Sequence, residues 1–580
     1  MPGAFDRADA LRRLSETHFD VLVVGGGVTG CGTALDAASR GLRTALVERD
    51  DFASGTSSKS SKLVHGGLRY LQQGDVRLVY EALAERQRLR KNAPHLVKVL
   101  PFLLPVFGKG GVIPKKLSRA LGSAMWMYDV TGGARIGRLH KRISADEAVA
   151  HMPTLPREKL ASSYLYYDAQ ADDARLTLTL ARTAALDHGA VIANGTRVVE
   201  ILKDATGKAS GARVEVTEDG QTRMFAVHAD AVVNAAGVWS DDIRSLDEGA
   251  HPGSIRPAKG IHITVPWAKV RNDIAVVVPV RSDRRSVFVV PWGDFTYIGT
   301  TDTDYDGPLD DPQCTAEDIT YLLDAMNDAM TTELTEADIL GTWAGLRPLV
   351  RDAGSERTAD LSRRHRVTPS ASSVVTVTGG KLTTYREMAA DTVDVVLEQV
   401  LGAKVLERAA KHSRTKRLAL RGADGYAAVL AEAQAGTPAT EARHGLESSG
   451  SASPATHIEH LANRYGGEAR GLLAMIEGDP SLAEPLVDGL PYLRAEAVYA
   501  ARYEMALTLD DILSRRTRAR LLGRDASAAA APAVAALVGP DLGWDQAEQE
   551  RQVKAYRAAI DEERHAADLP ETALDAATGA

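Results

Sequence analysis

A glycine-rich turn near the start of the chain has the residue types and spacing of a phosphate-binding site. Residues 25–30 read GGGVTG, a GxGxxG pattern. In such a pattern Gly25 permits a tight turn, Gly27 lets the backbone approach a pyrophosphate, and Gly30 lets a helix pack closely. Glu48 follows about twenty residues later, where a carboxylate can accept hydrogen bonds from both hydroxyls of an adenosine ribose. These residues predict a site for an adenine dinucleotide with an unphosphorylated ribose. The motif leaves FAD and NAD as alternatives.

The glycines must lie between a buried strand and a helix for this site to form. Residues 21–24 (VLVV) are too short an apolar run for a helix and predict a buried parallel strand. An alanine-rich stretch after the glycines predicts a helix that Gly41 ends, and residues 43–47 predict a second strand. The helix N-terminus supplies unpaired N–H groups for a phosphate. The order of elements indicates a Rossmann-like βαβ unit.

Length and composition limit the class of protein. With 580 residues the chain is long for one domain, and 44% apolar with 25% charged residues is ordinary for a globular protein. A net charge of −8 argues against a nucleic-acid-binding protein, which requires a basic domain. Cys31 and Cys314 are the only cysteines, so the sequence offers neither a disulfide framework nor a cysteine-based metal site. We expect no bound metal. The start of the chain lacks an apolar core of secretory length, and no apolar run approaches ~18 residues, so we also expect neither a signal peptide nor a membrane-spanning helix.

The pattern along the chain predicts a discontinuous α/β region followed by an all-α domain. Strand-like runs between residues 255 and 299 indicate an antiparallel sheet inserted into the nucleotide-binding fold. Past residue 410 the patterns are helical, interrupted at 436–455 by a segment of small and polar residues that predicts a flexible insertion. The expected boundaries are a helical or frayed leader at 1–18, nucleotide-binding segments at about 19–98, 170–245 and 341–405, substrate-domain segments at about 99–169 and 246–340, a helical domain at 410–566, and a disordered tail at 567–580.

Residues 99–142 combine apolar and basic side chains. The stretch opens with VLPFLLPVFGKGGVIPKK and runs through MWMYDVTGG to four basic residues between 135 and 142, with Asp129 the only acid after Lys109. Apolar and basic residues side by side suit a membrane surface with anionic head groups. Buried strands with a solvated basic loop are the alternative.

Residues 57–71, SSKSSKLVHGGLRYL, resemble the FAD-dependent glycerol-3-phosphate dehydrogenases, part of a wider group of flavoproteins that includes D-amino-acid and glycine oxidases. Matching pieces recur in order: VVNAAGVWSDDI, AKGIHITVP, FVVPWGDFTYIGTTDTDY, GLRPL, LSRRH and VTGGKLTTYREMA. The C-terminal region resembles the family's helical cap domain, most clearly at TLDDILSRRTR. The resemblance implies an α/β fold: a Rossmann-like FAD-binding domain, an inserted antiparallel-sheet substrate domain of the D-amino-acid-oxidase type, and an all-α C-terminal cap domain. It leaves the insertion and the tail without a counterpart.

The resemblance implies that the cofactor is FAD. The residues agree, because a long, buried flavin needs a second glycine-ended strand beside it, and residues 234–237 (NAAG) and 379–381 (GGK) offer such ends. Serine hydroxyls between 57 and 61 can donate hydrogen bonds to the pyrophosphate and ribityl chain. The expected cofactor-binding residues are Gly25, Gly26, Gly27, Val28, Thr29, Gly30, Glu48, Thr56, Ser57, Ser58, Ser61, Leu63, His65, Gly66, Gly67, Val198, Ala235, Ala236, Gly237, Trp239, Gly380, Lys381, Leu382, Thr383 and Thr384.

The implied reaction is oxidation of sn-glycerol 3-phosphate to dihydroxyacetone phosphate, in which a hydride leaves C2 for the flavin. A phosphate dianion requires fixed cations, and the planar fork of arginine suits phosphate best. Arg347 and Arg363 lie in motifs that match the family, and Lys381 could add a point charge. Arg69 and Tyr70, beside the flavin loop, could orient the glycerol hydroxyls. These five residues are the expected substrate-binding set.

His65 is the expected base for the hydroxyl proton, because imidazole titrates near neutral pH and His65 lies among the cofactor glycines. It could instead only hydrogen-bond the flavin. Arg347, the second expected catalytic residue, could polarise the C2 oxygen as charge develops. Lys259 and His262 match a family strand and are assigned only to the substrate domain.

Reduced flavin must pass its electrons on, and the family divides between quinone reducers at the membrane surface and oxidases that release hydrogen peroxide. We expect a quinone (menaquinone or ubiquinone), a homodimer, and a cytoplasmic protein with peripheral contact to the inner face of the plasma membrane. An amino-acid or glycine oxidase on the same fold is one rival hypothesis, and it would need one carboxylate-binding arginine. A non-catalytic flavin-binding regulatory protein is another.

Overall fold

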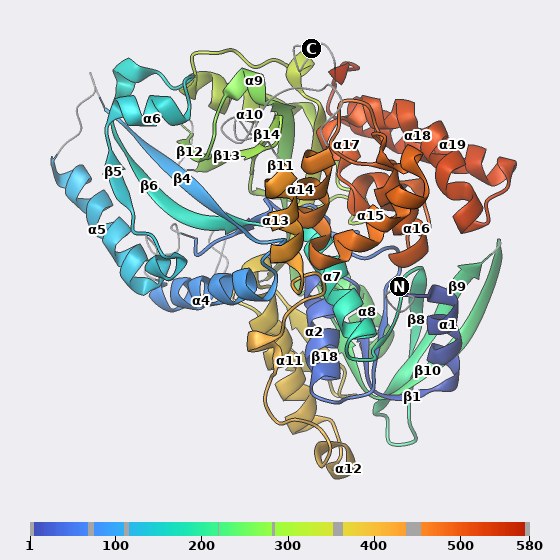
Figure 1. The fold of residues 1–580 in the computed structure, drawn as a ribbon. Helices are drawn as coiled ribbons and strands as arrows, with labels where there is room; N and C mark the ends of the chain where they lie inside the picture. Colours follow the sequence, from blue (N-terminus) through green and yellow to red (C-terminus); the bar gives the residue numbers. More distant parts are fainter. Residues whose placement is uncertain are drawn as a thin grey trace.

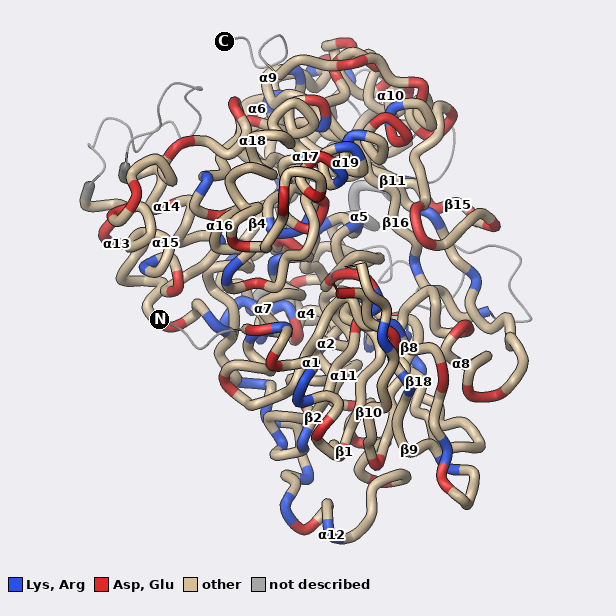
Figure 2. Tube along the Cα trace, turned by 90° about the vertical axis from the view of Figure 1, so that its right-hand side faces the viewer, with Lys and Arg blue, Asp and Glu red and all other residues tan. Residues whose placement is uncertain are grey.

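The computed structural model describes residues 5–67, 75–108, 115–218, 220–280, 285–351, 364–436 and 454–574. Within them, one β-sheet occupies the lower part of the view in Figure 1 and a second the upper left, while the C-terminal helices pack at the upper right. In the view of Figure 2, acidic and basic residues are interspersed along the described parts of the trace. This distribution agrees with the small net charge of the chain.

The first sheet holds the predicted βαβ unit. Its central strand, β1, pairs in parallel with β2 on one side and with β10 on the other, and all four residues of the apolar run 21–24 are buried. The antiparallel strands β8 and β9 extend the sheet from β10. The strands are β1 (His18–Val24), β2 (Thr44–Val47), β7 (Val191–Ala193), β8 (Thr196–Lys203), β9 (Ala209–Glu218), β10 (Gln221–Asn234), β17 (Arg366–Pro369) and β18 (Val375–Thr378), in the order β17-β18-β10-β1-β2-β7.

Helices cover this sheet and build the core with it. The glycine turn leads into α2, which packs against α7 and α11, and the alanines of α2 allow these helices to approach closely. The helices before the C-terminal domain are α1 (Arg7–Glu16), α2 (Val28–Ser39), α4 (Val76–Asn92), α5 (Lys115–Thr131), α6 (Ala145–His151), α7 (Asp173–Leu186), α8 (Ser240–Glu248), α9 (Trp267–Val270), α10 (Ala316–Ala329), α11 (Tyr385–Gln399) and α12 (Ala403–Leu406).

The second sheet is the predicted inserted sheet, antiparallel except where β12 pairs with β4. One boundary differs from the prediction: residues 341–350, expected in the nucleotide-binding part, form β16 and pair with β11 along ten residues. The strands are β3 (Leu63–Val64), β4 (Lys98–Phe107), β5 (Lys141–Ile143), β6 (Leu160–Gln170), β11 (Ile255–Pro266), β12 (Ala275–Pro279), β13 (Ser286–Trp292), β14 (Phe295–Gly299), β15 (Thr303–Asp304) and β16 (Gly341–Val350). This pairing carries Arg347 on a strand of the substrate sheet.

The C-terminal region is helical, as the sequence predicts. Its helices are α13 (Tyr426–Gly436), α14 (Pro454–Tyr465), α15 (Ala469–Gly478), α16 (Arg494–Tyr503), α17 (Ala519–Leu522), α18 (Arg524–Leu542) and α19 (Gln546–Ala566), with a π-helical turn, η12 (Asp511–Arg516), before α17. Most of the expected insertion at 436–455 lies outside the described residues. No helix of the described segments is long and apolar enough to cross a membrane.

The described segments near both ends of the chain, residues 5–16 and 567–574, are packed more firmly than the sequence suggests. In the expected leader, α1 buries Leu11 and Leu14 in the core of the first sheet. The expected disordered tail is wrong for residues 567–574, because Ala567, Leu569 and Leu574 are buried. The apolar spacing of these few residues is too short to read as an element, so only tertiary contacts reveal their burial.

Candidate active site

The glycine turn is as tight as the motif requires. Gly25 has φ +113°, and a Cβ there would lie 2.6 Å from the carbonyl oxygen of Ala235. A Cβ on Gly30 would lie 1.9 Å from the carbonyl oxygen of Gly25. The two glycines therefore let β1, β10 and α2 meet at one point, and the N-terminus of α2, beginning at Val28, faces the space beyond.

Glu48 closes β2 beside this turn. Its Oε2 accepts a hydrogen bond from the Gly26 backbone N–H at 2.5 Å, and its Oε1 accepts one from the Asp50 N–H at 2.8 Å. Burial raises the pKa of Glu48 to about 7, although both backbone hydrogen bonds favour the carboxylate. The carboxyl group is thus held at the wall of the site and needs a further partner to ionise fully at neutral pH.

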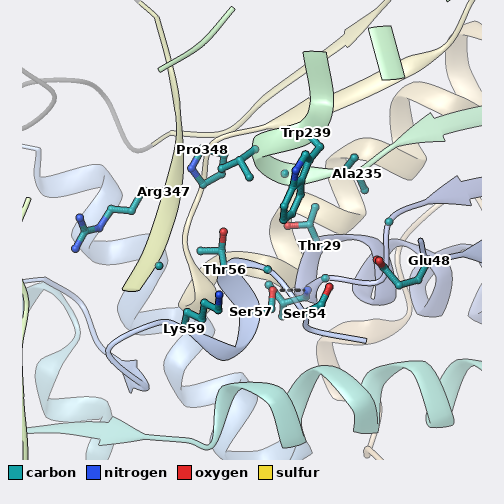
Figure 3. Close-up of a pocket in the computed structure, with 18 of the residues that line it drawn as sticks. Thr29, Glu48, Ser54, Thr56, Ser57, Lys59, Ala235, Trp239, Arg347 and Pro348 are labelled. Carbon is teal, nitrogen blue, oxygen red and sulfur yellow. Dashed lines mark hydrogen bonds between the residues drawn. The ribbon is translucent and has the colours of Figure 1, made fainter. Parts of the chain in front are cut away.

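One cavity of about 650 Å³ joins the predicted motifs (Figure 3). Twenty of the predicted site residues line it: Gly25, Gly27, Val28, Thr29, Glu48, Thr56, Ser57, Ser61, Leu63, His65, Val198, Ala235, Ala236, Gly237, Trp239, Arg347, Gly380, Lys381, Leu382 and Thr383. In Figure 3, Glu48 and Arg347 lie on opposite sides, with Thr56 and Ser57 between them. The cavity is therefore elongated, with the carboxylate at one end and the arginine at the other.

Six predicted cofactor residues do not line the cavity: Gly26, Gly30, Ser58, Gly66, Gly67 and Thr384. Ser58 is buried, and its hydroxyl donates to the carbonyl of Gly55. The Gly66 N–H donates to the hydroxyl of Tyr128, on α5. Gly26 and Gly30 act behind the surface, through Glu48 and through close packing. The predicted substrate residues Arg69, Tyr70 and Arg363 lie outside the described residues.

Residues 56–62, here called the serine loop, are fixed on several sides. The Ser57 hydroxyl accepts from the Val28 N–H at 2.9 Å, which ties the loop to the start of α2. The Thr56 hydroxyl donates to the Leu346 carbonyl on β16 at 2.6 Å. Ser61 Oγ lies 2.8 Å from Nε2 of His262, on β11. The loop therefore bridges the two sheets and forms one wall of the cavity.

Cationic and imidazole groups also line the cavity. Arg347 donates to the carboxylate of Asp302 at 3.1 Å and to the hydroxyl of Thr300 at 3.1 Å, which fixes its guanidinium. The ring of His65 stands perpendicular to that of Phe288 at 6.0 Å. Lys381 directly precedes the 3₁₀ turn that begins α11. These groups can bind an anion and accept a proton in the same space.

His262, Lys59 and Ser60 line the cavity but are absent from the predicted site. The imidazole of His262 stacks on Trp343 at 4.7 Å, and its buried Nδ1 has no hydrogen-bond partner in the described part of the chain. Burial lowers the pKa of His262 well below its usual value, with a smaller contribution from nearby cations. The AKGIHITVP motif was the available signal, but only strand pairing brings His262 to the serine loop.

Most of the chain is similar to known flavoproteins. A family model described as FAD dependent oxidoreductase matches residues 20–382, and a second, described as the C-terminal domain of alpha-glycerophosphate oxidase, matches residues 413–549. The glycerol-3-phosphate dehydrogenase 2 of Mycobacterium bovis is 42% identical over 97% of this chain and 91% of its own length. The mitochondrial glycerol-3-phosphate dehydrogenase of Homo sapiens is 38% identical over 95% of this chain and 74% of its own.

A solved structure from the same family has the same fold along nearly the whole chain. The glycerol-3-phosphate dehydrogenase of Bacillus halodurans, complexed with FAD, superposes with a TM-score of 0.73 at 31% identity, covering 96% of this chain and 97% of that one. The chain belongs to the FAD-dependent glycerol-3-phosphate dehydrogenase family. It is an enzyme, and its cofactor is FAD.

The residues around the cavity fit this cofactor. Glu48 would accept hydrogen bonds from the adenosine ribose hydroxyls, and the backbone N–H groups at the N-terminus of α2 would bind the pyrophosphate. A Cβ on Gly237 would meet nothing within 4 Å, so the backbone there borders open space that a long ligand can enter. The cations Arg347 and Lys381 line the same cavity as the dinucleotide motif.

Proposed function

We propose that the protein oxidises sn-glycerol 3-phosphate to dihydroxyacetone phosphate and passes the electrons to a quinone. The main support is the convergence of two cations, Arg347 and Lys381, with two imidazoles, His65 and His262, in the cavity that the dinucleotide motif also lines. A phosphate dianion needs cations, and oxidation of a secondary alcohol needs a proton acceptor. When bound, FAD supplies the acceptor for the hydride that leaves C2.

Arg347 and Lys381 would bind and orient the substrate. The Asp302 contact and the Thr300 contact fix the plane of the Arg347 guanidinium, so little rotamer freedom remains to be lost when a phosphate or a developing C2 oxyanion binds. Asp302 also offsets part of the charge, which leaves Lys381 as a needed second cation. The presence of Lys381 as well as Arg347 favours a phosphorylated substrate over an amino acid, whose carboxylate would need only one arginine.

His65 is the proposed base for the C2 hydroxyl proton. Its backbone N–H is held by the hydroxyl of Thr383 at 3.1 Å, which ties it to the start of α11. His262 is the second candidate, because it lines the same cavity and its Nε2 lies 2.8 Å from the Ser61 hydroxyl, although burial lowers its pKa and makes it the weaker base. Replacing each with Gln separates them, because loss of the base should abolish the acidic limb of the pH profile of kcat/KM.

The deciding experiment is an anaerobic titration of the purified enzyme with glycerol 3-phosphate while the flavin absorbance is followed. We expect bleaching of the yellow flavin, followed by fast re-oxidation with menadione and slow re-oxidation with oxygen. Equal turnover with both acceptors would refute the quinone assignment. Bleaching by glycine or D-amino acids instead would favour an amino-acid oxidase, and no bleaching by any substrate would favour a regulatory protein. The homodimer stays a prediction.

A surface around α5 supports peripheral attachment to a membrane. Trp126 and Val130 on α5 are 57% and 82% exposed, and Leu139 and Tyr80 are also exposed beside them. The guanidinium of Arg135 lies 4.5 Å from the ring of Tyr80, so basic and apolar groups share the surface. The helix stands at the left edge of the molecule in Figure 1. Such a surface suits anionic head groups and the acyl boundary, where a quinone resides.

Liposome flotation tests this attachment. The protein should float with vesicles of phosphatidylglycerol and phosphatidylcholine but not with phosphatidylcholine alone, and W126S/V130S should remain at the bottom of the gradient. Met224→Ser is the matched control, because Met224 is 57% exposed on β10, in the other sheet. Equal flotation of W126S/V130S and the wild type would contradict the proposed surface.

A further inference from the structure

The arginines of residues 508–518 (TLDDILSRRTR) point from the helical domain into the FAD-binding part. Arg515 and Arg516 both donate to the carboxylate of Asp51, at 2.7 and 2.6 Å. Arg518 follows them and its side chain is only 1% exposed. A buried guanidinium is stable only with well-placed acceptors, so these contacts define where the two parts of the chain are joined.

The partners of Arg518 are two consecutive carboxylates at the start of α7. Its Nε and Nη2 donate to Asp172 Oδ1 at 3.0 and 2.7 Å, and its Nη2 also donates to Asp173 Oδ1. Its Nη1 donates to the carbonyl of Ser514 and, at 3.4 Å, to that of Ser58 in the serine loop. Arg518 does not line the FAD cavity. It reaches the cavity wall from behind.

Asp173 holds the serine loop from the same side. Its Oδ2 accepts from both the backbone N–H of Ser60, at 3.0 Å, and the hydroxyl of Ser60, at 2.6 Å. Its Oδ1 accepts from Nζ of Lys62 at 3.0 Å, and that ammonium also donates to the Ser58 carbonyl at 3.0 Å. The side chains of Asp173 and Lys62 are 0% and 1% exposed. Asp173 thus links the helical domain to the backbone of the loop.

The loop needs such an external support. Lys62 has φ +56°, a conformation that a residue with a side chain adopts only when the surroundings hold it. Ser57, Ser60 and Ser61 also line the cavity, so the loop lies between Asp173 and the cavity. Without Arg518, Asp172 and Asp173 would leave excess negative charge behind a loop that must receive a diphosphate. Both the position of the loop and its charge balance therefore depend on the arginine.

We propose that Arg518 is a positioning residue for FAD: through Asp173 it fixes the serine loop in the geometry that receives the cofactor. The helical domain then contributes directly to cofactor affinity, although none of the atoms of Arg518 reaches the cavity. The inference depends on FAD binding and holds whichever alcohol or electron acceptor is used.

The test is a double-mutant cycle read by FAD affinity. Apoprotein of the wild type, R518Q, D173N and R518Q/D173N is titrated with FAD, and the dissociation constant is taken from the quenching of flavin fluorescence. We expect R518Q and D173N each to raise the dissociation constant about tenfold or more and to alter the visible circular dichroism of the bound flavin. The double variant should be within about threefold of R518Q, because the two residues act as one unit. R518K should recover part of the affinity, since an ammonium retains the charge but not the fork.

The matched control is R502Q. Arg502 pairs with Asp541 at 2.7 Å within the helical domain and is 46% exposed, so this variant removes the same charge from the same domain at the surface. Its dissociation constant should equal that of the wild type. A wild-type dissociation constant and flavin spectrum in folded R518Q would overturn the proposal, and so would additive effects of R518Q and D173N.

If R518Q does not fold, R518K and D173N carry the test, and wild-type affinity in both would overturn the proposal. FAD titration uses no substrate, so its outcome is separate from that of the anaerobic reduction by glycerol 3-phosphate. An enzyme that binds FAD normally but is not bleached would refute the proposed substrate only. Loss of FAD affinity in R518Q with normal bleaching of the residual holoenzyme would support both proposals.

Discussion

The affinity for FAD should fall as the pH drops below about 7, because Glu48 must be ionised to accept the ribose hydroxyls. Burial raises the pKa of Glu48 from its ordinary 4.5 to about 7 in the protein alone. Hydrogen bonds donated by the ribose favour the carboxylate, so bound FAD lowers this pKa. By linkage, a ligand that prefers the ionised form binds more tightly as the pH rises through the pKa of the free site.

The magnitude follows from that pKa. With a pKa of about 7, about 3% of Glu48 is ionised at pH 5.5 and about 90% at pH 8. If only the ionised form binds, the dissociation constant of FAD is about 30-fold higher at pH 5.5 than at pH 8, a difference of about 2 kcal/mol. Fluorescence titration of apoprotein between pH 5.5 and 8.5 measures it. Glu48→Gln should bind more weakly than wild type at pH 8 and lack the pH dependence.

The raised pKa of Glu48 also affects the stability of the apoprotein, which should fall as the pH rises while the affinity for FAD increases. The raised pKa means that the stabilising contribution of protonated Glu48 is present below pH 4.5 and is lost as the pH rises through about 7. Because FAD binds more tightly as the pH rises, the gain in Tm on adding FAD should increase with pH in the wild type. It should stay constant in Glu48→Gln. A flat affinity profile in the wild type, or an equal slope in Glu48→Gln, would show that Glu48 does not bind the ribose.

Three further predictions concern the active site and the glycine turn. Arg347→Ala should lower kcat/KM for glycerol 3-phosphate by about 100-fold or more, about 3 kcal/mol. R347A/D302N should recover part of this loss, because the single variant removes the arginine partner of Asp302. A loss within about twofold would refute the role of Arg347. Lys381→Ala should mainly raise KM, and steady-state kinetics with an unchanged KM would contradict phosphate binding. Gly30→Ala should be purified without FAD, because its Cβ would lie 1.9 Å from the Gly25 oxygen. The control Gly402→Ala, whose Cβ meets nothing within 4 Å, should keep FAD. The ratio of flavin to protein absorbance distinguishes the two variants.

The adenosine end of the site could be predicted from the sequence because its residues are close together in the chain. The strand, the glycines, the helix and Glu48 lie within one βαβ unit, whose geometry is nearly fixed by local patterns. The structure brings Gly25, Gly27 and Glu48 to one cavity, and their contact with FAD stays a prediction. The family resemblance then added the distant motifs, which no local pattern connects.

The other end of the site depends on tertiary pairing that a local pattern does not contain. His262 reaches Ser61 across 201 positions, because β11 pairs with both β14 and β16. Residues 341–350 follow a helical stretch and precede the last nucleotide-binding strand, so sequence order placed them in the wrong sheet. Their register with β11 corrects this and explains how Arg347 comes to lie beside Thr300 and Asp302.

The buried arginines of the helical domain are the clearest example of contacts that a local sequence pattern cannot predict. A run such as RRTRAR ordinarily predicts a solvated surface, since its partners cannot be identified from spacing alone. Here the Arg516–Asp51 and Arg518–Asp173 pairs join residues 465 and 345 positions apart, and all four side chains are at most 4% exposed. Removing the helical domain would remove both arginines together with the surface that packs on Asp51 and Asp173, so the end of β2 and the serine loop would lose the contacts that hold them. The helical domain and the FAD-binding part must therefore fold as one cooperative unit, and a truncation at about residue 410 should yield neither FAD binding nor a stable protein.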